Sequence, residues 1–120
     1  MAVMRYIVAD VDAAVGFYAL LGFDVDQQFG PTMAIVGRDD LTLWLAGPNA
    51  SASRPMPDGR RPEPGGWNRL VLTVDDLART VDELRAAGVP FRNDVVTGPG
   101  GSQILCEDPS GNVVELFQPA

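Results

Sequence analysis

Hydrophobic residues alternate with polar ones over several short stretches of this chain and follow a helical period in two others. Residues 1–9 alternate and are rich in Val, Ile and Tyr, which predicts a strand. Asp10 or Asp12 can cap a helix that Gly22 ends. The apolar stripe of this helix is Val11, Val15, Tyr18 and Leu21. Three further strands are predicted at 23–29, 32–36 and 41–46.

The same order of patterns returns after residue 66. Residues 67–74 predict a strand, Asp76 caps a second helix, and Gly88 ends it. The apolar stripe of this helix is Leu77, Val81 and Leu84. Three more strands are predicted at 90–96, 102–106 and 112–118. The last of them follows Asp-Pro-Ser-Gly-Asn at 108–112, a composition typical of a tight turn.

The two halves match at a constant offset of 66 residues, which pairs Val8 with Val74 and brings the helix caps and helix-ending glycines into correspondence. An internal duplication is the simplest account. It predicts a single α+β domain over residues 1–120, with module 1 at 1–46 and module 2 at 67–120. Each βαβββ module carries its helix on one face of its sheet, and we expect the two free faces to form an incomplete barrel around a shared cleft.

Residues 47–66 separate the two modules and hold five prolines and four glycines in twenty positions. Proline removes backbone donors and fixes φ, so we expect no regular element in this segment. Arg54, Arg60 and Arg61 make it locally positive. It is either a solvated linker or a mobile lid that closes over a site, since long structureless loops are often functional.

Strand alternation assigns side chains to the expected cleft, because the large apolar residues of each strand should pack on the helix and their neighbours should not. On the last strand, Glu115 lies on the cleft side between Val113 and Phe117, where an uncompensated charge is costly. The candidate ligand-binding residues on this side are Arg5, Trp44, Trp67, Arg69, Glu115 and Phe117. Two indoles and a phenyl ring with a few polar anchors suit a flat, partly aromatic small molecule. Trp67 can instead be a hydrophobic plug or a dimer contact.

Composition narrows the chemistry further. The net charge of −7 argues against a nucleic-acid or anionic-membrane partner, and no stretch is apolar for long enough to span a membrane. The chain has no histidine and no lysine, which excludes histidine bases, Ser-His-Asp triads and Schiff-base lysines. The single cysteine, Cys106, forms no intrachain disulfide and suits a reducing cytoplasm. Without a neighbouring base, we expect it to be an inert packing residue.

The chain resembles the glyoxalase/bleomycin-resistance group of the vicinal oxygen chelate superfamily. The resemblance rests on the two βαβββ modules, on Asp-Val-Asp…Phe-Tyr…Leu-Gly-Phe at 10–23, and on Asp-Pro-Ser-Gly-Asn-Val-Val-Glu-Leu at 108–116. It implies the glyoxalase/bleomycin resistance/dihydroxybiphenyl dioxygenase-like fold and a tendency to form homodimers. In metal-dependent members four strand positions bind a divalent cation, and they fall here on Val3, Trp44, Arg69 and Glu115. Only Glu115 can ligate a metal, so we expect no metal and no cofactor.

Several functions remain open at this point. Arg69 and Glu115 should form a bidentate ion pair, which either neutralises a vacated metal position or, with Arg5, offers donors to a ligand. The leading hypothesis is metal-independent binding of a small, partly aromatic molecule, as in drug-binding resistance proteins. The alternative is a glyoxalase-like lyase, isomerase or dioxygenase, either metal-free with Glu115 as the general base and best catalytic candidate, or recruiting a divalent metal.

Overall fold

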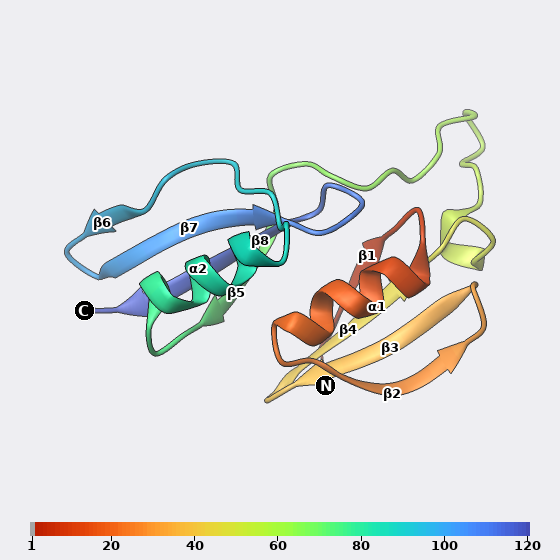
Figure 1. The fold of residues 1–120 in the computed structure, drawn as a ribbon. Coiled ribbons are helices and arrows are strands. Elements are labelled where there is room, and N and C mark those ends of the chain that lie inside the picture. The colour runs from red at the N-terminus through yellow and green to blue at the C-terminus, as the bar shows by residue number, and fades with distance from the viewer. Residues whose placement is uncertain (1) are drawn as a thin grey trace. The chain divides into compact units, whose positions relative to one another are not determined.

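The first half of the chain forms one four-stranded sheet with a single helix on one face (Figure 1). The computed structural model describes residues 2–120. The elements of this half are β1 (Val3–Ile7), α1 (Val11–Leu20), β2 (Asp24–Phe29), β3 (Met33–Arg38) and β4 (Leu41–Ala46). The strand order is β1-β4-β3-β2, in which β1 runs parallel to β4 and the other neighbours are antiparallel.

The second half repeats this arrangement, which confirms the predicted duplication. Its elements are β5 (Arg69–Thr73), α2 (Leu77–Ala86), β6 (Val96–Gly98), β7 (Gly101–Glu107) and β8 (Val113–Pro119). The strand order is β5-β8-β7-β6, again with one parallel pair, β5 and β8. The chain divides into two compact units between Gly65 and Gly66, and each unit has the α+β topology of one βαβββ module.

Both helices begin as the sequence predicts, because an aspartate caps each of them. Asp10 accepts a hydrogen bond from the Ala13 N–H at 3.1 Å, and Asp76 accepts one from the Arg79 N–H at 3.1 Å. In α2 the predicted stripe is the buried one. In α1 the prediction is wrong at Val15, which is only half-buried, because Ala14 and Phe17 face the sheet instead.

The strand predicted at 90–96 is largely absent. Only Val96–Gly98 forms β6, and Phe91 makes a single bridge to Cys106. Asn93 explains the interruption, because its side-chain oxygen accepts the Leu105 N–H at 2.9 Å and so replaces a backbone partner.

The segment 47–66 is more ordered than its composition predicts. A short 3₁₀ helix, η1, spans Ser51–Ser53, so the expectation of no regular element is wrong there. The stretch between Pro48 and Pro55 contains no proline, which leaves room for one turn. Ser53 is buried and its hydroxyl donates to the Gly47 carbonyl oxygen at 2.7 Å.

The turn before β8 has the predicted chemistry. Asp108 is 2% exposed, and its carboxylate accepts hydrogen bonds from the Ser110 N–H, the Asn112 N–H and the Asn112 amide at 2.9, 2.9 and 3.0 Å. This closed turn fixes where β8 begins and therefore where Glu115 lies. Over residues 2–120, no helix is long and apolar enough to cross a membrane.

Candidate functional site

Each sheet has one face that its own helix does not cover, called here the helix-free face (Figure 1). In the second unit, Leu70 and Leu72 of β5 are buried on the helix side, whereas Val71 between them is 54% exposed. The strand register places these residues on the helix-free face of this sheet: Arg69, Val71, Thr73, Gln103, Leu105, Val113, Glu115 and Phe117. The alternation predicted from the sequence is confirmed for β5 and β8.

Arg69 and Glu115 form an ion pair on this face. The Arg69 Nε lies 3.2 Å from the Glu115 Oε1. The Glu115 side chain is only 9% exposed, whereas the Arg69 side chain is 33% exposed. The guanidinium therefore compensates a buried carboxylate and still presents part of its surface to solvent.

The surroundings of this pair are apolar. Val71 and Leu105 lie opposite Glu115 on the two neighbouring strands, and Val113 is fully buried. Phe117 is half-buried two residues further along β8, on the same face. A charged pair among aliphatic and aromatic side chains can orient a polar group of a ligand while the neighbouring side chains contact its apolar body.

The helix-free face of the first unit carries a stacked arginine. Arg5 and Trp44 are register partners on β1 and β4, and the Arg5 guanidinium carbon lies 5.0 Å from the centre of the Trp44 ring. Arg5 is exposed and Trp44 is half-buried. This cation–π contact orders two flat groups, against which an aromatic ligand can stack.

Trp67 lies elsewhere than the sequence predicts. It precedes β5 rather than belonging to it, and it is 70% exposed, so strand alternation does not assign it to the helix-free face. The preceding glycines, Gly65 and Gly66, have φ of 103° and 89°, values that a continuing strand does not have.

Arg92 holds Trp67 in this position, and the sequence pattern gave no sign of its role. Its guanidinium carbon lies 4.6 Å from the centre of the Trp67 ring, and its nitrogens donate to the carbonyl oxygens of Gly66 at 2.8 Å and Gly111 at 3.1 Å. It also contacts Glu107 at 3.4 Å. No local pattern signals such a residue, because its partners come from three separate parts of the chain.

The four positions that the resemblance assigns to metal ligands do not supply a ligand set. Val3 and Trp44 offer no lone pair to a divalent ion, and Arg69 is a cation already in contact with Glu115. Within residues 2–120, no three His, Cys, Asp or Glu side chains come together as a metal-binding group. The residues present therefore do not fit a divalent metal at these positions.

Cys106 is fully buried on β7. Burial raises the pKa of its thiol to about 12, and the nearby carboxylates of Asp108 and Glu107 contribute in the same direction. A thiol with this pKa is almost wholly protonated at neutral pH. The full burial of Cys106 confirms the prediction of a packing residue.

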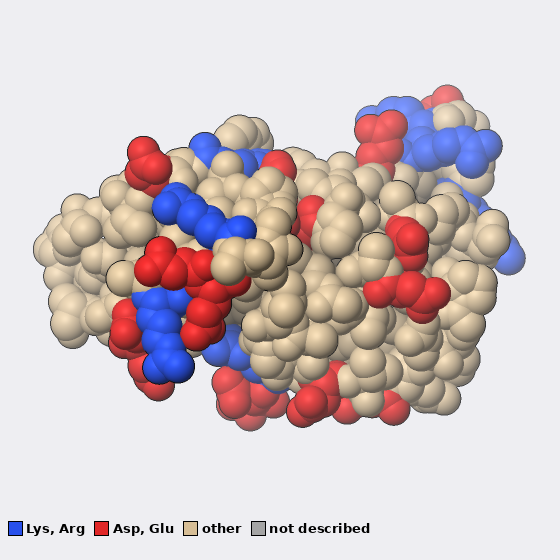
Figure 2. Space-filling view, viewed as in Figure 1, with Lys and Arg blue, Asp and Glu red and all other residues tan. Residues whose placement is uncertain are grey.

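The face of the molecule shown in Figure 2 carries no continuous basic surface that would suit a polyanionic partner. On the face in view, Figure 2 shows basic side chains in small groups interspersed with acidic ones rather than as a continuous basic surface. Nucleic acids need clustered positive charge.

The sequence matches one protein family over nearly its whole length. The family model described as "Glyoxalase/Bleomycin resistance protein/Dioxygenase superfamily" matches residues 1–116. No curated protein sequence matches the chain significantly.

Similar solved structures cover nearly the whole chain. A lactoylglutathione lyase from Agrobacterium tumefaciens is 23% identical, with a TM-score of 0.72 over 98% of this chain and 92% of its own. TnmS3, an antibiotic-binding protein from a Streptomyces species, is 28% identical, with a TM-score of 0.68 over 100% of this chain and 97% of its own. A glyoxalase-related enzyme from Fulvimarina pelagi is 21% identical, with a TM-score of 0.73 over 98% of this chain and 86% of its own. The likeness to the two proteins named as enzymes is a likeness of fold.

Proposed function

We propose that this chain binds a small, partly aromatic molecule reversibly and without a metal. The chain belongs to the Glyoxalase/Bleomycin resistance protein/Dioxygenase superfamily. The ligand contacts the helix-free faces, where the candidate residues are Arg5, Trp44, Arg69, Glu115 and Phe117. That both faces line one shared cleft stays a prediction, as does a part for Trp67 in binding. A role in resistance to a toxic compound, including an antibiotic, is part of this proposal.

The Arg69–Glu115 ion pair carries the proposal. The buried Glu115 carboxylate already has its partner, the Arg69 guanidinium at 3.2 Å, whereas the Arg69 side chain is still one-third exposed. Such a group can donate hydrogen bonds to a carbonyl or carboxylate of a ligand. The similarity to TnmS3, which is described as antibiotic-binding, supports the same reading at 28% identity.

The alternative is an enzyme in which Glu115 is the general base and Arg69 stabilises a developing enolate or oxyanion. The burial of Glu115 favours this alternative, whereas its ion pair with Arg69 weakens it, because a carboxylate stabilised by a neighbouring cation is a poorer base. A lyase, isomerase or dioxygenase that recruits a divalent metal would need ligands beyond the four positions described above.

Three further properties belong to the proposal. We expect the protein to work in the cytoplasm, because its only cysteine is a buried free thiol. We expect no cofactor, because the residues at the ligand positions do not fit a metal. We expect a homodimer. Light scattering coupled to size-exclusion chromatography measures the molar mass of the protein and tests this directly.

Tryptophan fluorescence quenching by a panel of small aromatic compounds tests the binding function. A compound that binds should quench saturably, and Arg69→Met should weaken its binding about tenfold, the effect of losing one charged hydrogen bond. Arg79→Met is the matched control, because Arg79 pairs with Glu83 at 3.1 Å on the surface of α2. Glu115→Gln separates the two functions. If the protein only binds its ligand, the variant should keep much of the affinity. If the protein is an enzyme with Glu115 as its base, the variant should keep the affinity and lose the turnover that the wild type shows.

A further inference from the structure

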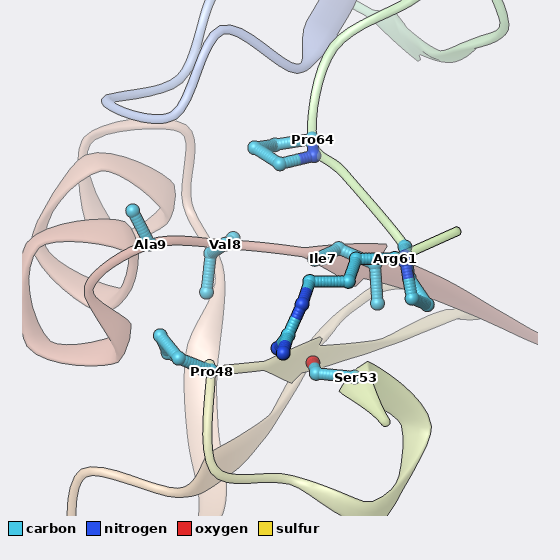
Figure 3. A pocket seen from close by; sticks show the side chains of 8 residues that line it. Ile7, Val8, Ala9, Pro48, Ser53, Arg61 and Pro64 are labelled. Atoms are coloured by element: carbon cyan, nitrogen blue, oxygen red, sulfur yellow. The ribbon is translucent and has the colours of Figure 1, made fainter. Parts of the chain in front are cut away.

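The segment 47–66 folds back on the C-terminal end of β1 and lines a half-open pocket of about 250 Å³ within the first unit (Figure 3). One wall is formed by Ile7, the last residue of β1, and by Val8 and Ala9, which follow it. The opposite wall comes from Pro48, Ser53 and the stretch 61–64, which contributes two more prolines. The pocket shares no residue with the ligand-binding set proposed above.

Arg61 is the one charged residue that lines this pocket. Figure 3 shows its side chain extending across the pocket, with the guanidinium toward Pro48 and Ser53. No carboxylate of residues 2–120 forms an ion pair with Arg61, whereas the adjacent Arg60 pairs with Asp58 at 2.7 Å. The Arg61 side chain is exposed to solvent, so its charge can meet an anion that enters the pocket.

The other polar group of the pocket adds no donor. The Ser53 hydroxyl hydrogen is committed to the Gly47 carbonyl oxygen at 2.7 Å. The remaining lining residues are aliphatic or proline. The pocket therefore offers one permanent positive charge on an otherwise apolar surface.

We propose that this pocket binds a small monocarboxylate with an apolar body. One guanidinium matches one carboxylate in a two-pronged geometry, and the apolar walls contact the hydrocarbon part. A volume of about 250 Å³ lies below the roughly 300–1,000 Å³ of typical ligand pockets, so the ligand is smaller than a drug-sized molecule. A phosphate group fits less well, because it carries more charge than one guanidinium compensates.

The segment is suited to holding such a pocket open. Pro48, Pro62 and Pro64 have fixed φ and lose little conformational entropy on folding, and the Ser53–Gly47 hydrogen bond fixes the η1 side. Preorganised walls of this kind lower the cost of binding. In this proposal the segment is neither a free linker nor a lid, because it forms a permanent wall of the site.

Titration of the ¹⁵N-labelled full chain with sodium hexanoate, followed by amide chemical shifts, tests the proposal. We expect saturable shifts at residues 7–9 and at the amides of Ser53 and Arg61. Hexanamide has the same apolar body without the charge, and it should bind at least about threefold more weakly, as expected for a partly exposed charged contact. Equal binding of hexanamide, or shifts confined to other residues, would overturn the proposal.

Arg61→Met and Arg54→Met form a matched pair, because each removes one exposed arginine from the same segment and Arg54 does not line the pocket. Arg61→Met should weaken hexanoate binding about three- to tenfold, and Arg54→Met should leave it within about twofold. Equal losses in both variants would mean that only overall charge matters, which contradicts a site at Arg61. Inorganic phosphate at the same concentrations should not displace hexanoate, and displacement would show that the ligand class is wrong.

Discussion

Arg69 and Glu115 reach each other diagonally across two parallel strands. The residue opposite Glu115 on β5 is Val71, and the residue opposite Arg69 on β8 is Val113, so the pair spans two residues of the ladder to bring Nε within 3.2 Å of Oε1. The corresponding residues of the first unit, Val3 and Trp44, stand in the same diagonal relation and carry no charge. The second unit therefore holds an ion pair that the first unit lacks.

Replacing Arg69 should destabilise the protein more than replacing Glu115. Arg69→Met leaves the buried Glu115 carboxylate without compensation, and we expect a loss of about 2 kcal/mol in the free energy of unfolding, reduced from a fully buried pair because Arg69 is one-third exposed. Glu115→Gln leaves a guanidinium that water can reach, so its cost should be smaller. Urea denaturation of both variants measures the difference.

The double variant Arg69→Met with Glu115→Gln supplies the control. If the two side chains interact as the distance indicates, it should be more stable than Arg69→Met alone, because the uncompensated charge is gone. Strict additivity of the two single losses would contradict a direct interaction.

The donor set on the helix-free faces predicts how the protein responds to metals. Purified protein should contain no stoichiometric metal, and neither EDTA nor added Zn²⁺, Mn²⁺, Ni²⁺ or Fe²⁺ should change the melting temperature, since an ion that binds only the folded state must raise it. Elemental analysis and a thermal-shift series measure both. One ion per chain with a clear rise in melting temperature would show that other residues supply the ligands.

Replacing glycine by alanine should destabilise the protein at one position and stabilise it at another. Gly101 has φ of +147°, and a side chain there would clash with the Gln118 carbonyl oxygen, so Gly101→Ala should destabilise the protein by at least about 1–3 kcal/mol. Gly16 lies inside α1, and apart from its chain neighbours and the backbone of the helix itself no atom comes within 4 Å of the place that an alanine methyl group would take, so Gly16→Ala should stabilise the protein by about 0.5–1 kcal/mol. Thermal or urea unfolding of the two variants should move in opposite directions.

Local sequence rules predicted the elements whose stability is itself local. The aspartate caps, the stripe of α2 and the Asp108 turn depend on residues within a few positions of each other, and all are found. The Arg69–Glu115 contact could also be predicted, because the family resemblance places the two residues at neighbouring ligand positions.

Features that could not be predicted from the sequence depend on contacts between distant segments. Asn93 interrupts the predicted strand at 90–96 by bonding to Leu105, and no pattern in that stretch indicates it. The pocket at Arg61 arises because a proline-rich segment returns to the end of β1, whereas its composition alone predicted a structureless linker or lid.

Arg92 should control the environment of Trp67. In a Trp44→Phe background, Trp67 is the only indole, and Arg92→Met should change its emission and increase its quenching by acrylamide, a neutral quencher, because the guanidinium no longer covers the ring. The loss of the hydrogen bonds to Gly66 and Gly111 should also cost about 1–3 kcal/mol of stability. Arg92→Lys should restore neither property in full, since an ammonium cannot make the same planar contacts. Unchanged emission in Arg92→Met would contradict the stacking.

We expect the buried thiol of Cys106 to make the protein less stable at alkaline pH. Burial raises the pKa of its thiol from 9.0 to about 12, so between these values the folded state keeps a proton that the unfolded state releases. The stabilising contribution is complete below pH 9.0 and is lost as the pH rises toward 12, at about 1.4 kcal/mol per pH unit. Cys106→Ala leaves a small cavity that lowers stability below pH 9.0, and it removes this slope, so the difference between the two proteins should shrink as the pH rises. The wild-type free energy of unfolding should therefore fall more steeply than that of Cys106→Ala as the pH rises from 9.0 toward 12, and parallel curves would show that the thiol does not titrate as described.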